Sequence, residues 1–307
     1  MIEYEFREVP GAGTATFATQ DISRWSLIMC EKPLISMRTD QASKTAVDIW
    51  NEYEAMSDED KAKYQTLVYT RPNLVLARRS IIETFAVDIG GWTDEMQHMA
   101  IVAATFWTNC FSTSAGPYVA SVYHANSKLN HSCANNMGQW TLEDGSQAMV
   151  ALRNIKAGEQ LTCPYIRQDA TYAVRRALLR HYDFSCRCAL CEIETYISDH
   201  PEMQIVLGGS VQSRQALDDM VMWLRHWFAK VQDQTESGRR KACADELGMS
   251  LPDAVSVCEL GIAILRHILE ETHTQTQQPY SQIQPTYQNL ESFTNISEDM
   301  KEQFPEL

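Results

Sequence analysis

Hydrophobic and polar residues alternate in short runs at the beginning of the chain and change to a helical period farther on. Residues 14–19 and 26–30 are short β-type runs bounded by turn residues, which predicts two short strands. The residues that follow have helical spacing, and Ser57, which stands three residues before an acid, is predicted to cap the N-terminus of a helix. A further helix is expected to begin near Thr93. This part of the chain is therefore predicted to place a helical segment after the first strands.

The pattern changes again toward the C-terminus. Residues 119–165 return to short β runs, with turns expected at Gly138, Gly145 and Gly158. After Cys191, apolar residues recur at helical spacing, which is typical of amphipathic helices. The two apolar stripes consist of Leu217, Met220, Val221, Leu224, Phe228 and Val231, and of Val255, Val257, Leu260, Ile264, Ile268 and Leu269. We expect a mixed, mostly β core around a helical segment, then a helical C-terminal third that ends in a loose tail.

The composition favours a folded protein and argues against direct binding of nucleic acid. Hydrophobic residues make up 44% and charged residues 21% of the chain, as in globular proteins. The net charge of −14 has the wrong sign for a protein that grips a phosphate backbone. There is no long apolar run, and acids stand near the N-terminus where a signal peptide carries bases. We expect a monomer of the cytosol or nucleus, with no membrane contact.

The cysteines suggest a metal site. The chain contains nine cysteines, and Cys186, Cys188 and Cys191 lie within six residues, a density typical of thiolates that converge on one ion. A tetrahedral zinc site needs a fourth ligand, which spacing alone does not identify. The candidates are Cys30, Cys110, Cys133, Cys163, Cys243, Cys258, His131 and His181. The alternative is that the three cysteines are incidental, but such clusters rarely arise by chance.

Three motifs, in this order, resemble those of SET-domain proteins. They are Asn130-His131-Ser132-Cys133, then Gly158-Glu159-Gln160-Leu161-Thr162-Cys163-Pro164-Tyr165, and then Tyr182-Asp183-Phe184-Ser185-Cys186-Arg187-Cys188-Ala189-Leu190-Cys191. Residues 11–22 are similar to the glycine-rich opening of that family, and residues 109–111 and 175–179 resemble segments of its SMYD-like branch. Residues 31–109 contain no cysteine, so the MYND zinc finger that interrupts the SMYD core is missing. The sequence therefore looks like a shorter, fungal-type relative.

This resemblance implies an α+β fold, with a SET-domain β-fold split by a helical insertion. A zinc-bound post-SET loop and a helical C-terminal region would follow. The expected parts are an N-terminal SET segment at 1–40, the insertion at 41–115, a C-terminal SET segment at 116–183, the post-SET zinc loop at 184–195, and a helical region at 196–307 with a loose tail.

The resemblance also implies two bound groups. In SMYD-like proteins the cysteine of the Asn-His-Ser-Cys motif is the fourth zinc ligand, so one structural zinc would be held by Cys133, Cys186, Cys188 and Cys191. Four thiolates leave no position for substrate, so this site would be structural. S-adenosyl-L-methionine is the family's methyl donor. Its predicted contacts are Gly11, Gly13, Asn109, Ser127, Asn130, His131 and Phe184.

The family's reaction is transfer of a methyl group to a protein lysine that enters through a narrow channel. Tyr165 matches the catalytic tyrosine, and Tyr182 matches an aromatic residue that lines the channel. The negative charge of the chain favours basic protein substrates, including histone tails. The alternative hypothesis is a divergent SET-fold protein that binds the cofactor but serves as an interaction module or acts on a small molecule. Departures from the family pattern at Ala12, Ala15, Asn135 and Pro164 motivate it, whereas retention of Tyr165 and Tyr182 favours the methyltransferase.

Overall fold

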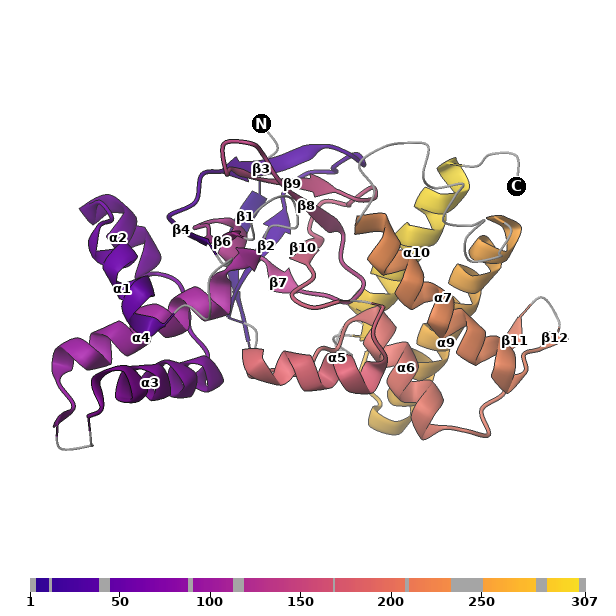
Figure 1. Cartoon of the computed structure of the whole chain (residues 1–307). Coiled ribbons are helices and arrows are strands. Elements are labelled where there is room, and N and C mark those ends of the chain that lie inside the picture. The colour runs from indigo at the N-terminus through magenta and orange to yellow at the C-terminus, as the bar shows by residue number, and fades with distance from the viewer. Residues whose placement is uncertain are drawn as a thin grey trace.

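The computed structural model describes residues 4–10, 13–38, 45–87, 91–112, 119–167, 169–207, 210–232, 251–279 and 286–303. Over these ranges the protein has a mixed α+β fold, as the resemblance implied. Figure 1 shows several small sheets at the centre, with helices α1 to α4 on one side of them and the C-terminal helices on the other. None of the described helices is long and apolar enough to cross a membrane.

The sheets are assembled from strands that lie far apart in the sequence. One sheet has the order β1-β2-β10-β7, and two three-stranded sheets have the orders β3-β9-β8 and β4-β6-β5. A fourth sheet pairs β11 with β12. The strands are β1 (Tyr4–Val9), β2 (Gly13–Ala18), β3 (Leu27–Glu31), β4 (Ile35–Arg38), β5 (Phe111–Ser112), β6 (Val119–Val122), β7 (Asn130–His131), β8 (Met137–Thr141), β9 (Gln147–Ala151), β10 (Gln160–Cys163), β11 (Val206–Leu207) and β12 (Ser210–Val211).

The pairing of β10 with β7 brings two of the sequence motifs together. This pair is parallel, with Thr162 opposite Asn130 and Cys163 opposite His131. The other pairs between described strands are antiparallel. The parallel contact places the Asn-His-Ser-Cys motif directly beside the strand that leads to Tyr165.

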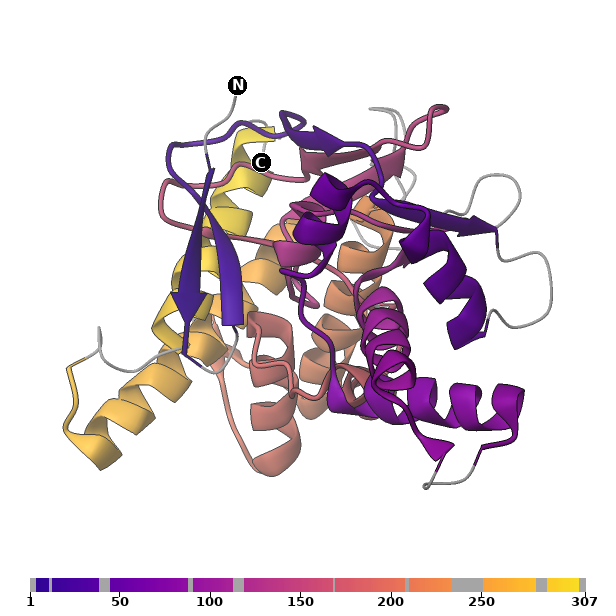
Figure 2. The same ribbon diagram turned by 90° about the vertical axis from the view of Figure 1, so that its left-hand side faces the viewer.

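Four helices form the insertion, and they face the viewer in Figure 2. They are α1 (Ala46–Glu54), α2 (Asp58–Tyr64), α3 (Arg71–Phe85) and α4 (Asp94–Asn109). The predicted cap at Ser57 is confirmed, because its side chain accepts a hydrogen bond from the Asp60 amide. The helix expected near Thr93 begins at Asp94, and the Thr93 side chain caps it by accepting a hydrogen bond from the Met96 amide. Apolar side chains including Ile49 join this insertion to β4 and β6 in one core.

The three glycines expected at turns have different roles. Gly145 and Gly158 have positive φ angles of 82° and 84°, a conformation that glycine adopts without strain, and both lie in turns. Gly138 instead lies within β8. A Cβ atom at this position would lie 2.8 Å from the side chains of both Leu152 and Trp140, so Gly138 is required by close packing.

The C-terminal region consists of helices packed on one another and on the cysteine motifs. The elements are α5 (Tyr172–Leu179), the 3₁₀ turn η3 (Arg180–Tyr182), α6 (Ala189–Asp199), α7 (Arg214–Gln232), α9 (Leu251–Thr276) and α10 (Thr286–Gln303). The members of the two predicted stripes that are described are buried, whereas the side chains of Phe228, Val231 and Val255 lie outside the described set. Cys191 lies in the first turn of α6, so the segment predicted as a zinc loop ends in a helix.

The structure differs from the expected loose tail, because α10 packs along α9. At Gly261 of α9 a Cβ atom would lie 2.5 Å from the ring of Phe293 in α10, and Phe293 is completely buried. The glycine thus permits a close helix contact. The periodicity of residues 286–303 is weak in sequence because polar residues occupy most of this helix.

Candidate active site and cysteine cluster

His131 connects the two central motifs. Its Nδ1 accepts a hydrogen bond from the Tyr165 backbone amide at 2.9 Å, and its Nε2 lies 3.2 Å from the sulfur of Cys133. Because Nδ1 is the acceptor, the neutral ring carries its proton on Nε2 and donates it to that sulfur. His131 therefore fixes the position of Tyr165 relative to the cysteine motif. Its contact with the cofactor stays a prediction.

Tyr165 is held by its hydroxyl group. The hydroxyl donates a 2.5 Å hydrogen bond to the carbonyl oxygen of Leu129. Burial, together with the neighbouring Cys163 and Tyr182, raises the pKa of Tyr165 well above its usual value. The phenol is thus protonated at neutral pH. Pro164, which lacks a backbone donor, comes directly after the end of β10 and leaves the paired part of the strand intact.

Two further aromatic residues approach Tyr165. The ring centroid of Tyr182 lies 4.9 Å from that of Tyr165, and the centroid of Phe184 lies 6.3 Å away in an edge-on arrangement. Burial raises the pKa of Tyr182 to about 12, so this phenol is also neutral. Phe184 also lies 6.0 Å from the ring of His131. The structure thus brings together four aromatic residues that the sequence assigned to the site.

A cavity of about 810 Å³ opens beside this cluster. Its wall is formed by the end of α4, the 3₁₀ turn η2 (Asn126–Lys128) and the segment around Tyr165. The lining residues include Asn109, Asn126, Ser127, Leu129, Tyr165 and Tyr182. The volume lies within the range of small-molecule sites. Four of the residues that the sequence assigned to the site therefore share one cavity.

The polar residues predicted to bind the cofactor differ in what they offer. Asn109 uses its amide nitrogen to hold the end of α4, donating to the carbonyls of Val68 at 2.7 Å and Thr105 at 2.8 Å. The Ser127 hydroxyl lies 3.5 Å from the Asn109 carbonyl oxygen. By contrast, the amide nitrogen of Asn130 is buried and has no partner among the described residues. The contact of Asn130 with the cofactor stays a prediction.

The glycine-rich opening is only partly described. Gly13 has a φ angle of 67° and begins β2 opposite Val9, so the hairpin requires a left-handed residue there. A Cβ atom at Gly13 would meet open space. Gly11 lies outside the described residues. The cofactor contacts of both glycines remain predictions.

The cysteine cluster is formed as the resemblance implied. The sulfur atoms of Cys133, Cys186, Cys188 and Cys191 all lie within 4.8 Å of one another. Tetrahedral zinc with Zn–S bonds of about 2.3 Å separates its sulfur ligands by about 3.8 Å, so the arrangement suits such an ion. Among the described residues, Cys30, Cys110, Cys163 and Cys258 lie outside this group, and Cys243 lies outside the described ranges. This four-cysteine group could hold a metal ion.

A buried arginine that sequence reasoning did not single out lies against the cluster. Arg175 is completely buried, and its Nη2 lies 3.7 Å from the sulfur of Cys191. The same guanidinium forms an ion pair with Glu194, which also accepts from Arg225 Nε at 2.5 Å. Burial alone would lower the pKa of Arg175, but Cys133, Glu194 and Cys191 raise it. Four thiolates around a divalent ion would carry about two negative charges, and Arg175 lies where its positive charge would balance part of them.

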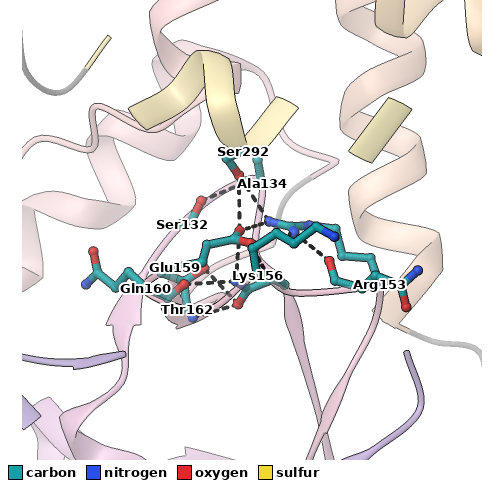
Figure 3. Close-up of polar contacts among 10 residues, drawn as sticks. Ser132, Ala134, Arg153, Lys156, Glu159, Gln160, Thr162 and Ser292 are labelled. Atoms are coloured by element: carbon teal, nitrogen blue, oxygen red, sulfur yellow. Dashed lines mark hydrogen bonds and ion pairs between the residues drawn. The ribbon is translucent and has the colours of Figure 1, made fainter. Parts of the chain in front are cut away.

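The C-terminal helices also contact the segment between β9 and β10 (Figure 3). Glu159 forms an ion pair with Arg153, and the same arginine donates to the Ser292 hydroxyl of α10 at 3.0 Å. Asn136 accepts from the Thr162 amide and donates to the Gln160 carbonyl, each at 2.8 Å. These contacts fix the strand that leads to Tyr165. Through Ser292, helix α10 contributes to the contacts that hold this strand.

Helix α10 also holds the segment that carries the cysteines. Asn289 donates to the carbonyl of Arg187 at 3.0 Å and to the Glu192 carboxylate at 2.5 Å. Thr286 donates to the other oxygen of that carboxylate. The core of the C-terminal helices also includes Cys133 and Cys191. One helix therefore contacts both the segment between β9 and β10 and the cysteine segment.

Comparison with known proteins identifies the family. The model of the SET domain family matches residues 13–166, about half of the chain, so the chain belongs to the SET domain family. This confirms the resemblance seen in the motifs. The chain is similar to the histone-lysine N-methyltransferase set5 of Schizosaccharomyces pombe, with 22% identity over 196 residues, covering 62% of this chain and 51% of that protein.

Other relatives match over shorter segments. The histone-lysine N-methyltransferase ATXR2 of Arabidopsis thaliana is 41% identical over 66 residues, covering 20% of this chain and 14% of that protein. The chain thus spans about half or less of the length of these two curated relatives. Among solved structures, the SET domain of LSMT bound to methyllysine and AdoHcy aligns with a TM-score of 0.41 and 13% identity, over 98% of this chain and 85% of that chain.

Proposed function

We propose that this protein is an S-adenosylmethionine-dependent methyltransferase that transfers a methyl group to the side chain of a lysine in a protein. The observation that carries the proposal is the position of Tyr165. Its hydroxyl is fixed on the Leu129 carbonyl in the wall of the 810 Å³ cavity, with Tyr182 beside it. Membership of the SET domain family supports the same reaction.

When bound, S-adenosylmethionine supplies a methyl group attached to a positively charged sulfur, which is itself the leaving group. With this group bound, the lone pair of the lysine Nε would form the new C–N bond, and the sulfur would leave with the electrons of the C–S bond. The ammonium group of the substrate must first release a proton to water. Neither Tyr165 nor Tyr182 removes this proton, because burial holds both phenols neutral. Their work is to align the amine and to exclude water.

The substrate we propose is a basic protein such as a histone. The net charge of −14 favours association with positively charged segments. The relatives set5 and ATXR2 are named as histone-lysine methyltransferases, which supports the same class of substrate and a nuclear location. Incubation of the protein with labelled S-adenosylmethionine and recombinant core histones tests this proposal. The same incubation is made with a protein extract. If the cofactor binds but no histone and no protein of the extract becomes labelled, the role of an interaction module or small-molecule enzyme is favoured instead.

We further propose that the four-cysteine group holds one structural zinc. Elemental analysis of protein prepared with sufficient zinc is expected to find about one zinc per chain. Cys188→Ser removes one of four thiolates and should lower both the zinc content and the thermal stability. Cys30→Ser is the matched control, because Cys30 is exposed and lies outside the group. Full zinc content in Cys188→Ser would contradict the assignment.

The cofactor pocket we propose includes Asn130, His131 and Phe184. The unpartnered amide nitrogen of Asn130 would donate to the cofactor. Asn130→Ala is therefore expected to weaken the binding of S-adenosylhomocysteine roughly tenfold in calorimetry. Asn154→Ala is a suitable control, because Asn154 accepts a hydrogen bond from the Arg24 amide elsewhere in the fold. Equal affinity in the two variants would remove Asn130 from the pocket.

A further inference from the structure

Asn126 has a buried side-chain amide and lies in the wall of the 810 Å³ cavity. The residue has 0% exposure, and neither its Nδ2 nor its Oδ1 has a hydrogen-bond partner among the described residues. Burial of an amide without partners is unfavourable. Buried polar groups of this kind are rare in folded proteins, and one next to a cavity points to a ligand that completes its hydrogen bonds.

The backbone fixes where Asn126 lies. The amides of Ala125 and Asn126 donate to the carboxylate of Glu31, at 3.1 Å and 2.6 Å. This contact anchors the first residue of η2 in the wall of the cavity, which Tyr165 and Tyr182 also line. Because the anchor uses only the backbone of Asn126, its side chain is not needed to hold η2 in place.

A second amide in the same wall has an unused oxygen. Gln139 of β8 lines the cavity, and its Oε1 is buried without a partner among the described residues. Tyr165 adds a third acceptor, because its only proton is donated to Leu129 and its oxygen retains lone pairs. The cavity wall thus contains three oxygen atoms that can accept hydrogen bonds, and such a wall suits a ligand that carries N–H groups.

We propose that Asn126 binds the substrate amine through Oδ1 and thereby favours the transfer of a single methyl group. This inference rests on the proposed function. A neutral lysine amine has two N–H groups and one lone pair. If Tyr165 and Asn126 each accept one N–H, the lone pair is left free to form the new C–N bond. After one transfer, a methyl group replaces one of the two N–H groups. The Oδ1 atom of Asn126 cannot accept a hydrogen bond from this methyl group and leaves no space for it.

Two substitutions of Asn126 distinguish the effect of its hydrogen bond from the effect of the space that its side chain occupies. Asn126→Leu keeps a similar volume without the amide, and Asn126→Ala opens room for a methyl group. Because the side-chain amide has no hydrogen-bond partner among the residues that the structure describes, the melting temperature of Asn126→Leu should equal or exceed that of the unmodified protein. Asn154→Leu is the matched control. It should lower the melting temperature, because Asn154 has a partner, and leave substrate binding unchanged.

Binding is measured by NMR titration with L-lysine in the presence of S-adenosylhomocysteine. The unmodified protein should bind lysine, and Asn126→Leu should weaken this binding roughly tenfold. Equal lysine affinity in the two proteins would overturn the proposal. So would a variant that loses affinity for S-adenosylhomocysteine alone, because Asn126 would then contact the cofactor and not the amine.

Products are measured by mass spectrometry of core histones. Asn126→Ala should raise the share of dimethyl-lysine and trimethyl-lysine at least several-fold over the unmodified protein, and an unchanged distribution would contradict the proposal. The proposed function fails separately, when the unmodified protein methylates no histone and no other protein of an extract. The lysine titration still tests Asn126 in that case.

Discussion

Replacing Arg175 with methionine is expected to lower the free energy of unfolding by about 3–5 kcal/mol. Arg175 is completely buried and Glu194 has 6% exposure, so removal of the guanidinium leaves a buried carboxylate with Arg225 as its remaining ion-pair partner among the described residues. The same change removes a positive charge from beside the sulfur of Cys191. Urea denaturation measures the first effect. The rate at which a chelator takes zinc from the protein measures the second and should rise roughly tenfold.

Arg176→Met is the matched control for this experiment. Arg176 is the next residue of α5, but it is exposed and its guanidinium stacks on Tyr172 without touching the cysteine cluster. Surface changes of this kind alter stability by about 0.5 kcal/mol or less. The double variant Arg175→Met, Glu194→Leu removes both buried charges and should recover much of the lost stability. If Arg175→Met is as stable as Arg176→Met, the buried ion pair has no structural importance.

Tyr165→Phe is expected to slow methyl transfer to histones roughly a hundredfold while leaving the affinity for S-adenosylhomocysteine nearly unchanged. The substitution removes only the hydroxyl that is anchored to Leu129, and loss of one preorganised group in a dry site has an effect of about this size. Labelled-methyl transfer and calorimetry, made on the same preparations, provide the two measurements.

The control is Tyr196→Phe, since the Tyr196 hydroxyl bonds to Glu271 in the C-terminal helices and this residue does not line the 810 Å³ cavity. Its methyl-transfer rate should match that of the unmodified protein. Equal rates for Tyr165→Phe and the unmodified protein would show that the hydroxyl does not take part in the reaction. A repurposed small-molecule enzyme would give this result, because its reacting atoms need not lie beside Tyr165.

The sequence by itself determined features that depend on neighbours along the chain. The cap at Ser57 and the beginning of a helix near Thr93 are local features, because the capping side chain and the amide it accepts from are separated by only three residues. The apolar stripes of α7 and α9 follow from helical periodicity. The spacing of Cys186, Cys188 and Cys191 indicated a metal site without any knowledge of the fold.

Other features depended on contacts between distant segments, and only the tertiary structure decided them. Spacing left the fourth cysteine of the cluster open, and only the folded chain shows the sulfur of Cys133 beside that of Cys191. Gly138 resembled a turn residue, whereas the side chains packed above it require a residue without Cβ. The sequence does not indicate the buried ion pair of Arg175 or the unpartnered side-chain amide of Asn126. Burial and hydrogen bonding of a side chain depend on which distant segments pack against it in the folded chain.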